Sequence, residues 1–252
     1  MMKWLKGLFG KSESSPPASA PPQGALARGG TLALMPVQKE QAQAEWQKRR
    51  GSARGVLVIL VDPFDHIEIK EDAEGGRPAE VLAQAAEVDL AEFFAARREN
   101  LSLDEDEEAD EELDAAHREP DPAKLTKATD PVRTFSGAEF GRSAFLSDIP
   151  CEAPWQVLAH YPFGGWNDTP YDHELTAVFR DWFERFGAVP ALISNDVIEF
   201  WVDRPIEDPA VAAKLAMEMF WLCPDVVDQG TESVGELANA LLGANVWYFW
   251  WD

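Results

Sequence analysis

The sequence predicts an α+β protein in which a ferredoxin-like split βαβ domain at the C-terminal end carries an N-terminal helix-strand-helix packed on it. Three observations lead to this fold class. Apolar residues recur at helical spacing in some segments and in short continuous or alternating runs in others. The resulting order in the C-terminal part is β-α-β-β-α-α-β. Of the 252 residues, 46% are hydrophobic, which is enough to bury a sizeable core.

The first hundred residues divide into a linker and a small α/β subdomain. Residues 1–30 are rich in Ser, Pro, Ala and Gly, so we expect a flexible N-terminal peptide and linker. In the subdomain, residues 31–100, helices are expected over 36–50 and 78–100. Between them, residues 56–61 form a continuous apolar run, which is typical of a strand covered on both faces.

Residues 101–150 are expected to form a mobile loop. Within them, residues 104–114 hold nine acids and no base, and several prolines follow. Such a composition repels itself and interrupts regular structure. A solvated loop is the simplest interpretation, and a regulatory or docking arm is the alternative.

Residues 151–252 are expected to form the C-terminal α+β domain. Residues 155–161 have the composition of its first strand, and a Gly-rich loop follows. Thr169 is expected to cap the next helix, with Pro170 in its first position, and Gly187 to end it. The apolar residues of this helix recur at the spacing of one buried face: Leu175, Val178, Phe179, Trp182, Phe183 and Phe186.

Two strands, 189–194 and 197–203, follow as a predicted hairpin. Alternation along the second strand places three side chains towards the helices: Ile198, Phe200 and Val202. The opposite face then receives Glu199, Trp201 and Asp203. We expect the N-terminal subdomain to cover this aromatic and acidic face, because exposed aromatic sheets aggregate. A partly open binding surface is the alternative.

The remaining elements have clear boundaries in the sequence. A helix that is apolar nearly all round begins after Asp208 and ends at Cys223. Ser233 and Glu236 form a capping box for a short helix. Residues 246–251 are an aromatic final strand.

The charge of the chain restricts its partners. The formal net charge is -23, and residues 152–252 alone hold seventeen acids and four bases. Nucleic-acid binding depends on basic side chains that displace counterions, so no nucleic-acid partner is expected. An acidic surface instead favours a basic protein partner, or serves only to keep the protein soluble.

Cysteine usage and hydropathy point to the cytoplasm. The two cysteines, Cys151 and Cys223, lie far apart in the sequence and in no zinc-binding pattern. No apolar run approaches the length of a membrane-spanning helix. Residues 1–10 place Trp, Leu and Phe on one helical face beside two lysines, so we expect at most weak membrane contact there.

Three motifs stand out in the C-terminal domain: YPFGGWN at 161–167, CPDVVDQG at 223–230 and VWYFWWD at 246–252. In this order and spacing they resemble the bacterial family catalogued as domain of unknown function 4253, over about residues 151–252. The sequence also resembles the pattern of this family at Trp182, Gly187, Glu199 and Glu218. The resemblance implies a fold and a family membership, and it implies no activity.

The candidate site residues come from these motifs and from the second hairpin strand. As ligand or partner residues we select Trp166, Asn167, Glu199, Trp201, Asp225, Asp228, Gln229, Trp250 and Trp251. The competing interpretation is structural, with glycines that permit a tight turn and tryptophans that fill the core.

No catalytic residues can be assigned. A phosphate site at the Gly-Gly loop is disfavoured because Asp168 and Asp172 would repel the anion. These two acids with His160 and His173 match no known metal spacing, so we expect neither a metal nor another cofactor. Cys223 ends a buried apolar helix, which is typical of an inert core thiol.

We therefore expect an acidic protein-interaction module, of an immunity type or another neutralising partner of a basic protein, rather than an enzyme. The alternative is a small-ligand binder or enzyme with a site between the GGWN loop, Glu199 and the CPDVVDQG loop.

Overall fold

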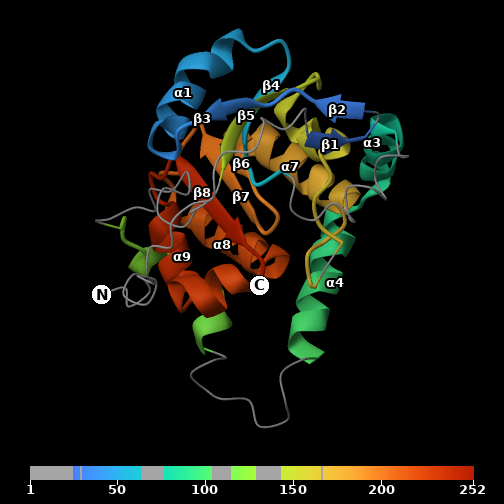
Figure 1. The fold of residues 1–252 in the computed structure, drawn as a ribbon. Coiled ribbons are helices and arrows are strands. Elements are labelled where there is room, and N and C mark those ends of the chain that lie inside the picture. The colour runs from blue at the N-terminus through green and yellow to red at the C-terminus, as the bar shows by residue number, and fades with distance from the viewer. Residues whose placement is uncertain (1–24, 29, 64–76, 104–114, 129–142, 166) are drawn as a thin grey trace, which may run out of the picture.

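The structure is a computed structural model that describes residues 25–28, 30–63, 77–103, 115–128, 143–165 and 167–252. Its centre is a six-stranded mixed sheet with strand order β3-β5-β4-β6-β7-β8 (Figure 1). The strands are β3 Met35–Val37, β4 Val56–Val61, β5 Ala144–Ile149, β6 Ala188–Ile193, β7 Val197–Val202 and β8 Val246–Trp250. A separate two-stranded sheet contains β1 Ala25–Ala27 and β2 Gly30–Leu32.

Helices cover both faces of the large sheet. The α-helices are α1 Ala42–Arg49, α3 Pro78–Glu87, α4 Leu90–Leu103, α6 Val157–His160, α7 Asp172–Phe186, α8 Pro209–Leu222 and α9 Val234–Leu241. Short 3-10 helices lie at Lys39–Gln41, Arg50–Ser52, Pro122–Lys124 and Pro154–Gln156, and a π-helix at Val226–Thr231. Helix α1 packs on one face, and α6, α7, α8 and α9 bury their apolar side chains on the other. No helix in the described part of the chain is long and apolar enough to cross a membrane.

The N-terminal strand β4 lies in the middle of the sheet. It pairs in parallel with β6, through Ile59 opposite Leu192, and antiparallel with β5. Its alternate side chains enter two different cores, with Val58 and Leu60 under the helices and Ile59 and Val61 under α1. The prediction of a strand covered on both faces is confirmed.

The strand predicted at 155–161 is wrong, because these residues are helical. Pro154 opens a 3-10 turn, and the side chain of Gln156 accepts hydrogen bonds from the backbone N–H groups of Glu152 (2.9 Å) and Ala153 (3.1 Å). Helix α6 continues from this turn with its apolar residues fully buried. The fold as a whole is mixed α+β, as predicted, but the ferredoxin-like strand order is not confirmed.

The prediction of a mobile loop over residues 101–150 is wrong for several described stretches, because α4 continues to Leu103 and a 3-10 helix spans Pro122–Lys124. Residues 144–149 form β5, which pairs antiparallel with both β3 and β4. The apolar run here is short and follows a long polar segment, so only its two neighbouring strands select the extended conformation. The acidic block at 104–114 lies outside the described residues.

Three helix starts differ from the prediction. The helix expected over 36–50 begins at Ala42, because Met35–Val37 is taken up by β3. The helix expected over 78–100 is two helices, and the carboxylate of Asp89 caps α4 by accepting from the Ala91 N–H at 2.9 Å. Helix α7 begins at Asp172, because Glu174 accepts from the Tyr171 N–H at 2.9 Å, whereas Thr169 caps nothing.

The later elements agree with the prediction. Asp208 caps α8 by accepting from the Ala210 N–H at 2.8 Å, and Ser233 caps α9 by accepting from the Glu236 N–H at 3.2 Å. Gly187 takes the left-handed conformation, with φ 68°, at the end of α7. Strand β7 also alternates as expected, with Ile198, Phe200 and Val202 in the core beneath the helices.

Trp182 is the centre of that core. Its indole ring is fully buried and contacts the rings of Phe179, Phe200, Trp247 and Phe249. Its Nε1 donates a hydrogen bond to the Glu218 carboxylate at 3.1 Å. A buried indole N–H needs such an acceptor, so Glu218 is part of the fold as well as of the surface.

Helix α1 covers the second face of the sheet at Trp201. Trp46 on α1 is buried against Trp201, with ring centroids 6.2 Å apart. The Arg50 guanidinium lies 5.0 Å from the Trp46 ring centroid and 5.4 Å from that of Trp201. Asp203 accepts from Arg50 at 3.0 Å and from the Trp201 indole at 2.7 Å. Trp201 and Asp203 on this face thus contact the N-terminal part.

Candidate functional site

Three segments far apart in the sequence meet at the end of β8. Asn167 donates from Nδ2 to the main-chain oxygen of Asp252 at 2.6 Å. The Asp252 N–H donates to Asp225 at 3.1 Å, and Gln229 donates from Nε2 to Asp225 at 2.8 Å and to Asp252 at 3.4 Å. We refer to Asn167, Asp225, Gln229 and Asp252 as the loop junction. It brings together three of the residues selected from the sequence.

Local backbone geometry explains why these side chains meet. Gly164 and Gly165 have φ values of 88° and 78°, and a Cβ atom on Gly164 would collide with the carbonyl oxygen of Pro170. Only glycine therefore permits this turn. Beyond α8 the chain forms the π-helix Val226–Thr231. Asp225 is its N-cap residue and lies four residues before Gln229, so the two side chains can bond to each other.

The loop junction has unbalanced negative charge. Asp225 and Asp252 form no ion pair with any residue that the structure describes, and the same holds for the neighbouring Asp168. Asp228 differs, because its carboxylate lies 2.6 Å from Nε2 of His117. Two carboxylates that are held by amide donors and form no ion pair among the described residues are suited to attract a cationic group.

Arg97 on α4 is a residue near the junction that sequence reasoning missed. Its Nε donates to the carbonyl of Trp221 at 2.9 Å and its Nη2 to that of Leu222 at 3.3 Å, at the C-terminal end of α8. Burial lowers the pKa of Arg97, although the charges of Asp168 and Glu174 act in the opposite direction. A cation at a helix C-terminus satisfies otherwise unpaired carbonyls. Arg97 therefore fixes α4 against α8 just before the junction.

The tryptophans of the last motif do not form a shared ligand surface. Trp251 is buried, with its ring 5.4 Å from Phe163 and 5.9 Å from Phe249, and its Nε1 has no partner in the described structure. Trp250 is half-buried on the other face of the sheet, and its Nε1 donates to Asp196 at 3.3 Å. Trp166 lies outside the described residues.

The sheet separates Glu199 and Trp201 from the loop junction. Glu199 is fully buried on β7, opposite Tyr248 of β8, on the face that α1 covers. Asp225 and Gln229 follow α8, which packs on the other face. The structure thus divides the candidate residues into two groups, and it does not place Glu199 between the two loops.

The described residues contain no arrangement typical of metal or nucleophilic catalysis. No group of three or more His, Cys, Asp or Glu among them could hold a metal ion. Asp172 forms an ion pair with Arg28 instead, and His173 stacks on Tyr171. Burial raises the pKa of the Cys223 thiol, which donates to the Trp250 carbonyl at 3.1 Å, so a reactive thiolate is disfavoured.

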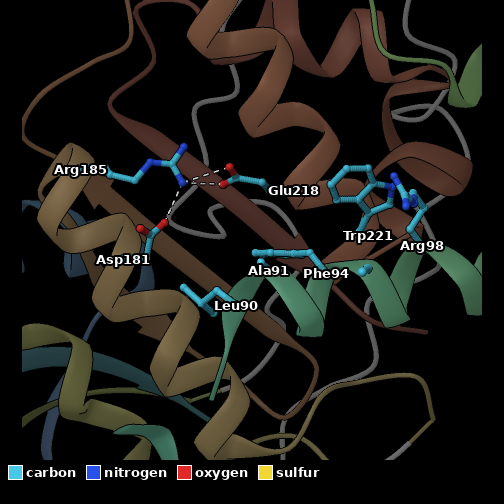
Figure 2. A pocket seen from close by; sticks show the side chains of 9 residues that line it. Leu90, Ala91, Phe94, Arg98, Asp181, Arg185, Glu218 and Trp221 are labelled. Carbon is cyan, nitrogen blue, oxygen red and sulfur yellow. Dashed lines mark hydrogen bonds and ion pairs between the residues drawn. The ribbon is translucent and has the colours of Figure 1, made fainter. Parts of the chain in front are cut away.

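An open groove of about 470 Å³ lies between α4, α7 and α8 (Figure 2). One wall carries Arg185 and Asp181 of α7 with Glu218 of α8, joined by ion pairs. The other side carries Arg98 of α4 beside Trp221 of α8. Apart from the family likeness of Glu218, no motif in the sequence identifies this place, since its residues come from helices far apart along the chain.

The comparison with known families places the junction in a defined domain. Residues 145–252 match the family described as Domain of unknown function (DUF4253), which confirms the resemblance over this part of the chain. The matched region includes all four residues of the loop junction. No curated protein and no solved structure matches the chain.

Proposed function

We propose that the protein is an interaction module that binds a basic protein partner through the loop junction and the residues around it. The observation that supports this function is the unpaired charge of Asp225, Asp252 and Asp168 among the described residues. Carboxylates in this arrangement steer a cationic surface towards the protein and fix its orientation.

A stacked aromatic pair near the junction, of which the tyrosine is exposed, supports the same function. Tyr171 is 63% exposed and stacks on His173, with ring centroids 5.9 Å apart. The pair lies at the start of α7, and Gly165 faces the Tyr171 ring. Tyrosine is enriched among the residues that dominate binding energy at interfaces. Tyr171 would supply contact area next to the carboxylates that supply attraction.

Neutralisation of a basic toxic protein, as in an immunity protein, is the specific form of this function that we favour. Such a partner must be recognised quickly and tightly, and opposite net charges raise association rates. The net charge of -23 and the hydrogen bonds that hold the junction in place both suit that task.

The test is affinity capture of the tagged protein from its own cells at low and high salt, with quantitative mass spectrometry. A triple variant, Asp168→Asn, Asp225→Asn and Asp252→Asn, removes the unpaired charges. The control, Glu184→Gln with Glu207→Gln, removes exposed acids elsewhere on the surface. We expect a basic protein that the wild type and the control capture at low salt, and that high salt or the triple variant releases. An empty capture, or equal capture by the triple variant, would refute the proposal.

A further inference from the structure

The groove between α4, α7 and α8 has two chemically different ends. At one end, Arg185 donates from Nη1 to Asp181 at 2.7 Å and to Glu218 at 2.8 Å and 3.0 Å. Burial lowers the pKa of Arg185, but these hydrogen bonds outweigh it and raise the pKa overall, so the side chain stays cationic. Two carboxylates against one guanidinium leave this end with one excess negative charge.

The other end carries a cation that is free to bind. Arg98 is exposed on α4 and has no hydrogen-bond or ion-pair partner in the described part of the chain. Its planar guanidinium matches the geometry of a carboxylate, which it can bind through two parallel hydrogen bonds.

Apolar side chains lie between these ends. Leu90, Phe94 and Trp221 line the groove and are half-buried, and the rings of Phe94 and Trp221 lie 6.2 Å apart (Figure 2). The volume of about 470 Å³ falls in the range of small-molecule sites, roughly 300–1,000 Å³. The hydrogen bonds of Arg97 to the end of α8 hold α4 in place, so the groove exists before any ligand binds.

From these features we infer that the groove binds a small zwitterion with an apolar body, of which a dipeptide of apolar residues is the smallest fitting example. The ligand carboxylate binds Arg98, its ammonium group lies at the Asp181–Glu218 end, and its side chains contact Phe94 and Trp221. This site is separate from the loop junction and does not depend on the function proposed there.

The test is calorimetric titration with leucyl-phenylalanine, its N-acetyl form, its C-terminal amide, and glycyl-glycine. The acetylated probe lacks the ammonium group and the amide lacks the carboxylate, so each removes one charged end of the ligand. Arg98→Gln and Asp181→Asn remove the corresponding groups of the protein. Lys214→Gln is the matched control, because Lys214 is exposed on α8 and does not line the groove.

We expect saturable binding of leucyl-phenylalanine and about tenfold weaker binding of each blocked form and of glycyl-glycine, from the loss of one charged hydrogen-bonded contact or of the apolar contacts. Arg98→Gln should weaken leucyl-phenylalanine and its acetylated form while leaving the amide unchanged, and Asp181→Asn should show the converse pattern. Lys214→Gln should change nothing. Absence of saturable binding by every probe, or equal weakening of all probes by both variants, would overturn the inference.

Discussion

The groove includes residues of α8 and the loop junction includes residues that follow α8, and the two places use their polar groups in opposite ways. In the junction, Asp225 and Asp252 accept or donate hydrogen bonds within the cluster, but their charge has no cationic partner among the described residues. In the groove, the charges of Asp181, Glu218, Arg185 and Arg98 balance, but Arg98 keeps its donors free. One site retains charge and the other retains hydrogen-bonding capacity.

This difference predicts two kinds of recognition. Excess charge acts over several ångströms and weakens with salt, which suits a large basic protein surface. Free directional donors beside an apolar floor act only at contact, which suits a small ligand with a matching carboxylate. Binding at the junction should therefore be the more sensitive of the two to ionic strength.

We expect the largest effect from Glu218→Ala, which tests whether the negatively charged end of the groove also stabilises the fold. Glu218→Ala leaves the buried Trp182 indole N–H without its acceptor and removes one of the two carboxylates that bind Arg185. The free energy of unfolding should fall by about 2–3 kcal/mol, the usual cost of a buried unpaired group together with a lost ion pair. Urea denaturation measures the change.

Glu184→Ala is the matched control, because Glu184 is exposed on α7 and its side chain has no partner among the described residues. Its effect should stay within about 0.5 kcal/mol, as for most surface substitutions. If Glu218→Ala lowered the free energy of unfolding as little as Glu184→Ala, Glu218 would not stabilise the core through Trp182. The negative end of the groove would then be no more important for the fold than the Arg98 end.

A smaller loss is expected at the loop junction. Asp225→Ala removes the acceptor of the Asp252 N–H and of the Gln229 amide, both at an exposed place. The expected loss of unfolding free energy is about 1–2 kcal/mol, because each net hydrogen bond contributes roughly 0.5–1.5 kcal/mol. Denaturation in urea compares it with Glu207→Ala, an exposed acid outside the junction. An unchanged stability would show that the junction does not tie the three segments together.

Local signals in the sequence were sufficient for elements that contain their own boundaries. Asp208 and Ser233 cap the helices that they were expected to cap, and the alternation along β7 placed Phe200 correctly. The short apolar runs at 144–149 and 155–161 were not predicted correctly. A run of this length fits a strand or a buried helix equally well, and only the neighbouring strands or the Gln156 side chain decide between them.

Among the candidate site residues, too, local motifs predicted some positions and the packing of distant elements determined the others. Distinctive motifs led to Asn167, Asp225 and Gln229, which do meet in the structure. Alternation along β7 placed Glu199 on the face opposite the helices, but only the structure shows that the residues following α8 lie on the other side of the sheet from it. The groove was missed because Arg98 and Asp181 share no local pattern and come together only through the packing of α4 against α7 and α8.

The smallest predicted effect concerns a third polar place, the end of α6, where Arg28 and Asp172 form an ion pair. Arg28 binds the carbonyl of Leu158 at 2.8 Å and the carboxylate of Asp172, and it lies near His160. Burial, and secondarily the charge of Arg28, lower the pKa of His160 below 6.5. The imidazole of His160 therefore binds a proton more readily in the unfolded chain than in the folded protein. Its contribution to stability is fully present above pH 6.5, declines as the pH falls below that value, and levels off below the folded pKa.

His160→Gln removes this proton uptake, so it should lose less stability than the wild type between about pH 7.5 and about pH 5.5 in urea denaturation. The carboxylates that are protonated in acid contribute equally to both proteins. Identical pH profiles for His160→Gln and the wild type would mean that burial does not lower the pKa of His160 in the folded protein.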